Sequence, residues 1–292
     1  RCVAALGNKY FHNAYVNCLR ENQTDGLNKS ERKELVVASL TSFPARINQV
    51  WITVETIMRQ SMKPDIIELW LSREQFPGEL DDIPYELLDQ RKRGLSIYFC
   101  DDDLRSHKKY YYAMQMHPDA VVITFDDDFF YPLDTIEMLL REHQRNPEDV
   151  IGMANPRFSH DDFWKPIDWA MQTEHKANAT NLGVCGGAPS LFPAHALDPD
   201  VFCMEIAKER CFLADDLWLT LMTYKNNRRI TTLARLPFLI PVPDTQEQAL
   251  TKKNNNSDFA VNNNTQWQDI VDFYFDDLKE WLLELSVQSK HI

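Results

Sequence analysis

Glycine is scarce in this chain of 292 residues, which contains only 8 of them. This excludes collagen-like and glycine-rich low-complexity proteins, since both need glycine throughout. Long apolar runs are missing too, and none approaches the roughly 18 residues that a membrane-spanning helix needs. Hydrophobic residues make up 44% of the chain and charged residues 26%. This is an ordinary globular composition, so the sequence predicts a folded protein without a membrane span.

Positive charge is also in short supply. Lysine and arginine number 31 against 44 acidic residues, for a formal net charge of −13. A field of this sign repels nucleic acid, and no basic stripe with interleaved aromatic residues offsets it. We therefore expect no nucleic-acid partner. An anionic substrate would need a local basic pocket or a metal ion.

Paired cysteines are absent as well. Six cysteines are scattered without a Cys-x-x-Cys pair, at positions 2, 18, 100, 185, 203 and 211. This pattern is typical of apolar core residues in a reducing compartment. The chain opens with Arg1 and shows no secretory signal, so we expect a cytoplasmic protein or one domain excised from a larger one.

Short apolar runs alternate with helical patterns from residue 34 onward. Runs at 35–40, 66–71, 95–100 and 120–125 predict buried strands, and residues 47–58, 106–116 and 133–144 predict helices. This alternation favours an α/β fold with a mostly parallel sheet flanked by helices, whose ligands bind at the carboxyl ends of the strands. Further on, residues 155–200 predict a loop-rich segment over a site, residues 241–266 an irregular connection, and residues 267–285 one amphipathic helix.

Three consecutive aspartates, Asp126, Asp127 and Asp128, follow the last predicted strand. At a partly buried strand end each pair of such charges costs about 3 kcal/mol, which a divalent cation would remove. Alternate residues of an extended segment point the same way, so Asp126 and Asp128 can converge on one Mn²⁺ or Mg²⁺. A solvated aspartate-rich turn is the alternative, and spacing alone leaves both open. The earlier run at 101–103 is interpreted as such a turn.

Four segments together resemble one known family. They are residues 39–47, residues 118–132 with the three aspartates, residues 186–193, and residues 214–218. Their order and spacing over residues 34–250 resemble bacterial glycosyltransferases of the GT-A fold, which use nucleotide sugars, carry a DxD motif and build surface polysaccharides. The resemblance implies a catalytic domain at 34–250, preceded by a helical extension at 1–33 and followed by a linker and an amphipathic helix at 251–292.

The resemblance also implies roles for individual residues. Asp126 and Asp128 would hold the metal and the donor diphosphate, with Asp127 nearby. Asp216 would be the catalytic base, and Asp215 would orient the acceptor. The donor side would further include Thr41, Phe43, Arg46 and Lys109, and the acceptor side Gly186 and Gly187. The segment after Gly187 departs from the family pattern, which leaves the identity of the acceptor open.

His160 and Trp164 lie in the irregular segment and are further candidates for the acceptor side. An aromatic face suits the apolar face of a sugar ring, and His160 is a candidate to complete the metal or acceptor site. The alternatives are a surface histidine and a core tryptophan. For Asp215 and Asp216 the alternative is the ordinary preference of acidic residues for the first turn of a helix.

The sequence thus predicts a metal-dependent glycosyltransferase. It would transfer a sugar from a nucleotide-diphosphate sugar, expected to be UDP-linked, to a hydroxyl of a glycan or glycolipid in capsule or lipopolysaccharide synthesis. One base and one metal favour inversion, with retention as the alternative. Two other classes stay open, a metal-dependent phosphotransfer enzyme and a non-catalytic sugar- or partner-binding module of a larger polymerase. The C-terminal helix is a candidate for peripheral association with a partner or with the inner face of the membrane.

Overall fold

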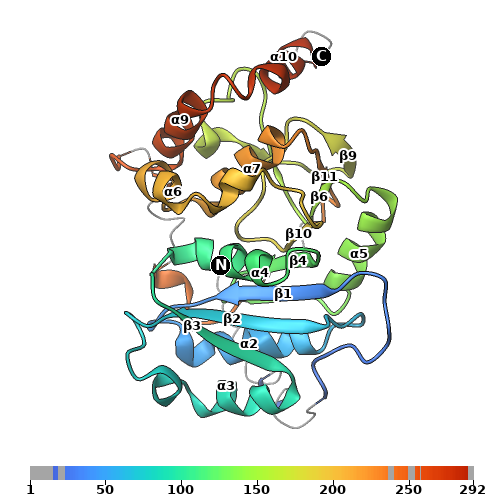
Figure 1. The fold of residues 1–292 in the computed structure, drawn as a ribbon, viewed down its shortest axis with the longest axis vertical. Helices are drawn as coiled ribbons and strands as arrows, with labels where there is room; N and C mark the ends of the chain where they lie inside the picture. Colours follow the sequence, from blue (N-terminus) through green and yellow to red (C-terminus); the bar gives the residue numbers. More distant parts are fainter. Residues whose placement is uncertain (1–15, 19–23, 236–239, 249–253, 257, 289–292) are drawn as a thin grey trace, which may run out of the picture.

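The computed structural model describes residues 16–18, 24–235, 240–248, 254–256 and 258–288. Within these residues one sheet of eight strands forms the centre of the molecule, in the order β3-β2-β1-β4-β10-β6-β11-β9 (Figure 1). The pairings of β9 and β10 are antiparallel, and all other pairings in this sheet are parallel. The mostly parallel α/β fold expected from the sequence is confirmed.

The eight strands are β1 (Val36–Thr41), β2 (Ile66–Ser72), β3 (Leu95–Cys100), β4 (Val121–Phe125), β6 (Val150–Gly152), β9 (Lys176–Ala179), β10 (Ser190–Phe192) and β11 (Ile230–Thr232). Two small sheets pair β5 (Phe129–Phe130) with β12 (Ile240–Pro241), and β7 (Pro156–Arg157) with β8 (Ala170–Met171).

The helices are α2 (Ile47–Met58), α3 (Tyr85–Gln90), α4 (Lys108–Met116), α5 (Thr135–Arg145), α6 (Met204–Arg210), α7 (Asp215–Lys225), α9 (Asn263–Phe273) and α10 (Lys279–Gln288). Short 3-10 helices are η1 (Glu79–Asp82), η2 (Arg91–Arg93), η3 (Arg105–His107), η4 (Pro166–Asp168), η5 (Pro199–Phe202) and η6 (Gln246–Gln248). Among these residues, no helix has the length and apolar character that a bilayer crossing needs.

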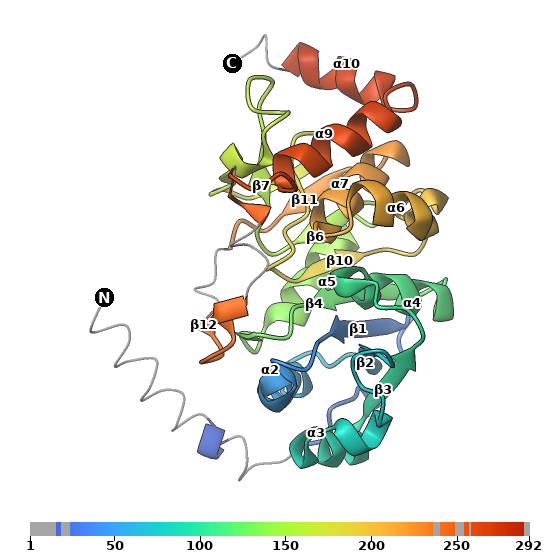
Figure 2. The ribbon, with the colours of Figure 1, turned by 90° about the vertical axis from the view of Figure 1, so that its left-hand side faces the viewer.

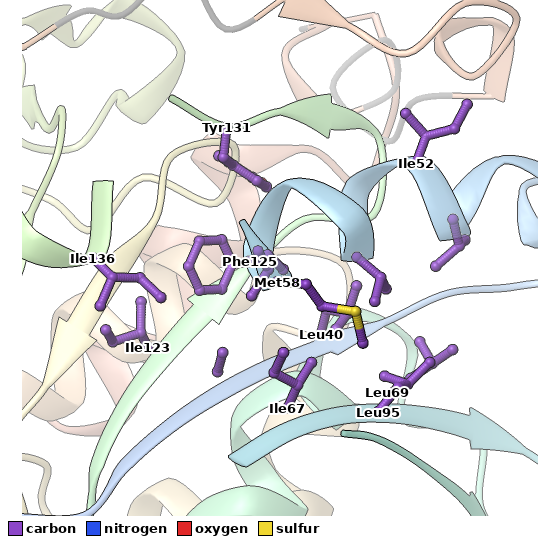
Figure 3. Close-up of a cluster of buried hydrophobic side chains, with 14 of the residues drawn as sticks. Leu40, Ile52, Met58, Ile67, Leu69, Leu95, Ile123, Phe125, Tyr131 and Ile136 are labelled. Carbon is purple, nitrogen blue, oxygen red and sulfur yellow. The ribbon is translucent and has the colours of Figure 1, made fainter. Parts of the chain in front are cut away.

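Strands β1, β2 and β4 are buried on both faces, whereas the four central residues of the edge strand β3 are half-buried. Leu40 of β1 lies in the same apolar cluster as Met58 of α2, whereas Val37, three residues earlier in the strand, packs with Ala113 of α4. Successive side chains of a strand point to opposite faces, so α2 and α4 cover the two sides of the sheet (Figure 2). Figure 3 shows Leu40, Ile67 and Phe125 of three neighbouring strands gathered near Met58. This burial explains why these strands have continuous apolar sequences.

The other half of the sheet is built from short strands. β6, β10 and β11 have three residues each, and all nine residues are buried. β10 enters the sheet between β4 and β6 and pairs with both. The interpretation of residues 155–200 as a loop-rich segment is therefore incomplete, because this segment supplies β10 and β9 to the sheet.

Helices α6, α7, α9 and α10 lie together at the end of the molecule farthest from α3 (Figures 1 and 2). Trp267 of α9 and Trp281 of α10 are buried and contact each other edge to face. Core packing thus accounts for much of the predicted apolar stripe. The prediction of one continuous helix is wrong, since residues 274–278 interrupt it. Asp276 and Asp277 fall in this break, as expected because aspartate disfavours helix interiors and favours the residues at a helix start.

Three further expectations meet the structure only in part. Within the expected helical extension, residues 16–18 are helical and residues 24–33 are not, and residues 1–15 and 19–23 lie outside the described part of the chain. Of the five cysteines in the described residues, Cys100 and Cys211 are buried, Cys185 and Cys203 are half-buried, and Cys18 is exposed. Helix α10 exposes Leu283 and Val287 by 66% and 57%. Association with a partner or a membrane through this helix stays a prediction.

Candidate active site

A cavity of about 390 Å³ opens at the carboxyl ends of the four parallel strands. Its wall includes the last residue of β1 and the segment after it (Thr41, Ser42, Phe43 and Arg46), the aspartates after β4 (Asp126, Asp127 and Asp128), the start of α4 (Lys108 and Lys109), the start of α7 (Asp215 and Asp216), and Gly186 and Gly187 before β10. Crevices at this edge of an open α/β sheet are where such folds bind ligands. The structure thus brings the segments that carry the sequence resemblance into one cavity.

Arg46 connects two of the three aspartates. Its Nη1 lies 2.6 Å from Oδ1 of Asp127, and its Nη2 lies 2.9 Å from Oδ2 of Asp128. The Ser42 hydroxyl donates a hydrogen bond to the other oxygen of Asp127, which is thereby fixed on both sides. The guanidinium of Arg46 also donates to the carbonyl of Thr245 at 3.1 Å. The predicted donor-side residue Arg46 therefore neutralises the aspartates and attaches residues 240–248 to them.

Lys109 joins the aspartates after β4 to those of α7. Its Nζ lies 2.8 Å from Oδ1 of Asp126 and 3.0 Å from Oδ2 of Asp215, and the residue is only 4% exposed. Burial acts against the charge of Lys109, but the two carboxylates outweigh it and raise the pKa of the ammonium group. Lys109 is therefore a permanent buried cation between two acidic segments far apart in the sequence.

Two carboxyl groups of the cavity are easily protonated. Burial, together with the charges of Asp126 and Asp127, raises the pKa of Asp128 to about 7 against the opposing effect of Arg46. Burial and the charge of Asp215 raise the pKa of Asp216 to about 7 as well. For Asp215 the burial is overcome by Lys109, which holds its pKa below the usual value. The pKa values of the neighbours Asp215 and Asp216 are thus shifted in opposite directions, so that Asp215 is ionised and Asp216 can exchange a proton near neutral pH.

The environment of Asp216 leaves its carboxylate accessible from the cavity. One oxygen accepts a hydrogen bond from the backbone N–H of Leu217 at 2.9 Å. The other faces Gly186, where a side-chain methyl group would lie 3.4 Å from it. A methyl group built on Gly187 would meet nothing within 4 Å, so the space above this glycine is open. The two glycines therefore leave room for a ligand beside Asp216.

The acidic residues of the cavity meet only some of the requirements of a divalent-cation site. Within the described residues, no group of three His, Cys, Asp or Glu side chains is arranged to hold a metal ion. Cationic and amide partners occupy the carboxylates instead, and Gln246 donates to Oδ2 of Asp128 at 2.7 Å. The second oxygen of Asp128 is nevertheless buried and has no hydrogen-bond partner among the described residues. A hard cation would satisfy this oxygen and favour the ionised form of Asp128, so the residue fits the role of a metal ligand.

His160 and Trp164 are not part of this cavity, and their assignment to its acceptor side is corrected. Both line a separate hollow of about 600 Å³ between residues 159–164 and helix α10. The reason is packing, since Phe163 between them is buried against Trp267 and Trp281 of the C-terminal helices. The side chain of His160 is 67% exposed.

Several cavity residues were missed by the sequence analysis. Asp103 was interpreted as part of a solvated turn, but it lines the cavity and pairs with the buried ammonium of Lys108 at 2.5 Å. Gln75 also reaches the cavity and donates to Asp103 at 2.9 Å. Both follow the carboxyl ends of strands, which is the signal that would have found them. The other missed residues are Arg105, Ser106, Phe129, Leu213, Gln246, Asn254, Asn255 and Asn263.

No family model matches the sequence, and no curated protein matches it. Among solved structures, a 4-diphosphocytidyl-2C-methyl-D-erythritol synthase is 10% identical with a TM-score of 0.44, over 77% of this chain and 100% of that one. The mannosyltransferase PcManGT from Pyrobaculum calidifontis, in complex with GDP-Man and Mn²⁺, is 12% identical with a TM-score of 0.47, over 87% of this chain and 69% of that one. At this level of similarity, neither assigns a ligand or a residue's role to this chain.

Proposed function

We propose that the protein is a metal-dependent glycosyltransferase. It would transfer a sugar from a nucleotide-diphosphate sugar to a hydroxyl group of a glycan or glycolipid acceptor. The observation that carries the proposal is that Asp128 and Asp216 share one cavity and each has a pKa of about 7. Asp128 has a carboxylate oxygen without a partner among the described residues, and Asp216 lies beside open space. This is the combination that a cation site and a general base for a sugar hydroxyl require.

The strand order supports a direction for the donor across the cavity. The ends of β1, β2 and β3 lie on one side of β4, and Gly186 and Gly187 lead into β10 on the other. With the diphosphate at Asp126 and Asp128, the nucleoside would extend toward Thr41 and Phe43, and its sugar toward the two glycines. A divalent cation, Mn²⁺ or Mg²⁺, held by Asp126 and Asp128 would act as a Lewis acid toward the diphosphate.

The proposed reaction is a single displacement with inversion. The acceptor hydroxyl oxygen forms a bond to the anomeric carbon of the donor sugar, the bond from that carbon to the phosphate oxygen breaks, and the nucleoside diphosphate leaves. Asp216 takes the hydroxyl proton, for which its pKa of about 7 is well matched near neutral pH. Asp215 remains ionised beside Lys109 and orients the acceptor. A uridine donor and a surface-polysaccharide acceptor are part of the proposal and rest on the sequence resemblance.

The proposal is tested by thermal stabilisation with nucleotides and nucleotide sugars, each with and without Mn²⁺. A ligand that binds only the folded state raises the melting temperature by mass action, so no acceptor is needed. We expect a shift with one nucleoside diphosphate and its sugars that depends on Mn²⁺ and is lost in Asp128→Ala. A control is Asp101→Ala, at an exposed aspartate after β3 that does not line the cavity. The absence of any shift would reject a nucleotide-sugar enzyme.

A further inference from the structure

The C-terminal part of the chain closes one wall of the cavity. Asn254, Asn255 and Asn263 line it together with Leu213, which lies two residues before Asp215. The three asparagines lie beyond residues 34–250, over which the sequence resembles glycosyltransferases. Their role therefore has to be inferred from their contacts, and these point to a ligand.

The asparagine wall is fixed to the loop that leads into α7. The side-chain nitrogen of Asn254 donates to the carbonyl of Leu213 at 2.5 Å. The backbone N–H of Leu213 donates in turn to the side-chain oxygen of Gln266 on α9 at 2.9 Å. At the start of α9, the side-chain nitrogen of Asn263 donates to the side-chain oxygen of Asn255 at 3.0 Å. Each amide of Asn254 and Asn263 is thereby oriented, with its nitrogen on the protein.

This orientation leaves two carbonyl oxygens without donors. Oδ1 of Asn254 and Oδ1 of Asn263 are buried and have no hydrogen-bond partner within the described part of the chain. Asn254 is only 7% exposed, so little water is available to it. Buried carbonyl oxygens in proteins are normally paired, and an unpaired one costs free energy. The two oxygens thus lack hydrogen-bond donors, which a ligand in the cavity would supply.

The chemistry of this wall differs from that of the donor side. The donor side carries the cations Arg46 and Lys109, which suit phosphate groups. The asparagine wall instead combines neutral amides with one apolar side chain, Leu213. Carbonyl oxygens repel phosphate oxygens, which are acceptors too, but they accept hydrogen bonds from hydroxyl groups. A neutral ligand rich in hydroxyl groups fits this wall.

We propose that Asn254 and Asn263 form the subsite for a neutral sugar of the acceptor and accept hydrogen bonds from its hydroxyl groups. This inference rests on the proposed function, because it assigns the acceptor of the same reaction. The wall lines the same cavity as Asp215 and Asp216, and Asn254 is bonded to Leu213, two residues before Asp215. An acceptor hydroxyl has to reach the base in this cavity. Leu213 would contact the apolar face of the sugar ring. The acceptor side is thereby moved from His160 and Trp164 to the C-terminal asparagines.

The test measures binding of p-nitrophenyl glycosides of glucose, galactose, mannose and N-acetylglucosamine, by saturation-transfer NMR, to the protein with Mn²⁺ and UDP. At least one glycoside is expected to bind the wild type. Asn254→Ala and Asn263→Ala should each weaken its affinity by about 3- to 10-fold, the value of one lost neutral hydrogen bond. Asn256→Ala is the matched control, since Asn256 lies on the same segment and does not line the cavity.

The melting temperature and the Mn²⁺-dependent shift with nucleotide are measured on the same variants. Asn254→Ala can lower the melting temperature because its hydrogen bond to Leu213 is lost. In that case Asn263→Ala carries the test, because within the described residues the side chain of Asn263 has one hydrogen bond, to the exposed Asn255. Unchanged glycoside affinity in Asn263→Ala, or no glycoside binding by the wild type, would overturn the inference. Nucleotide binding without glycoside binding would reject this subsite alone. Asparagine-dependent glycoside binding without any nucleotide binding would reject the proposed function instead.

Discussion

Replacing Lys109 by methionine should strongly destabilise the protein. The side chain is about the same length, but the variant leaves Asp126 and Asp215 without the cation that lies 2.8 and 3.0 Å from them. Breaking a buried ion pair by removing one partner costs about 3–5 kcal/mol, because a buried charge stays uncompensated. At about 2–4 °C per kcal/mol for a chain of this size or somewhat smaller, the melting temperature should fall by roughly 6–20 °C.

The pH dependence identifies the cause of this loss. Burial already raises the pKa of Asp126 above its usual value in the wild type, whereas Lys109 holds the pKa of Asp215 below it. Without Lys109, both folded-state pKa values should lie well above the unfolded-state value of about 3.9. The folded variant then binds protons more tightly than the unfolded one, so its stability is greatest at low pH and is lost as pH rises through the folded-state values. The difference from the wild type should therefore be largest above pH 7 and shrink toward pH 4.

Urea unfolding of wild type and variant between pH 4 and pH 8 provides the measurement. Lys92→Met serves as the control, because Lys92 forms a 2.7 Å ion pair with Asp89 but is 73% exposed. Its loss should change stability little, since an ion pair whose lysine is this exposed contributes little to stability. If Lys109→Met were no less stable than Lys92→Met, or if its loss of stability were the same at pH 4 and pH 8, the description of Lys109 as a buried bridging cation would be wrong.

Three further predictions concern the cavity. Asp128 has a pKa of about 7 and must lose its proton to bind a cation. Calorimetry should therefore show that the affinity for Mn²⁺ falls about tenfold per pH unit below pH 7. An affinity that does not change from pH 5 to pH 8 would exclude Asp128 as a metal ligand. Asp216→Asn should leave Mn²⁺-dependent nucleotide binding intact and lower the rate of transfer about 10²- to 10⁴-fold. The wild-type kcat/KM should rise with pH up to about 7, since only the ionised carboxylate of Asp216 accepts a proton. Transfer by Asp216→Asn at the wild-type rate would exclude Asp216 as the base. Gly187→Ala should keep the wild-type melting temperature, because its new methyl group meets nothing within 4 Å, while raising KM for the acceptor; a large loss of stability would show that the space is not open.

The strands of the first half of the sheet could be predicted because each has five to seven residues, most of them apolar. The predicted ranges 66–71 and 95–100 match β2 and β3 to within one residue. The three-residue strands β6, β10 and β11 give no such signal, since a run this short has no measurable period. β10 is stabilised by pairing with β4 and β6, which are distant in sequence. Such pairing is a tertiary effect that local patterns do not contain.

The same contrast holds in the candidate site. Asp126 and Asp128 became candidates because they follow the end of a buried strand, and Asp216 became one because residues 214–218 resemble a segment of a known family. Asn254 reaches the cavity only through the path of the chain after β12, which no sequence pattern predicts. His160 was misplaced for the corresponding reason, because an irregular segment carries no periodicity to show which cavity its residues face.

Product analysis tests the central proposal most directly. The wild-type protein is incubated with Mn²⁺, each nucleotide sugar in turn and the four p-nitrophenyl glycosides, and the products are identified by mass spectrometry. The proposal predicts that one donor yields a glycoside heavier by one sugar residue, together with an equal amount of nucleoside diphosphate, and that Asp216→Asn yields neither. Recovery of every nucleotide sugar intact, or release of inorganic phosphate in place of a new glycoside, would contradict glycosyl transfer.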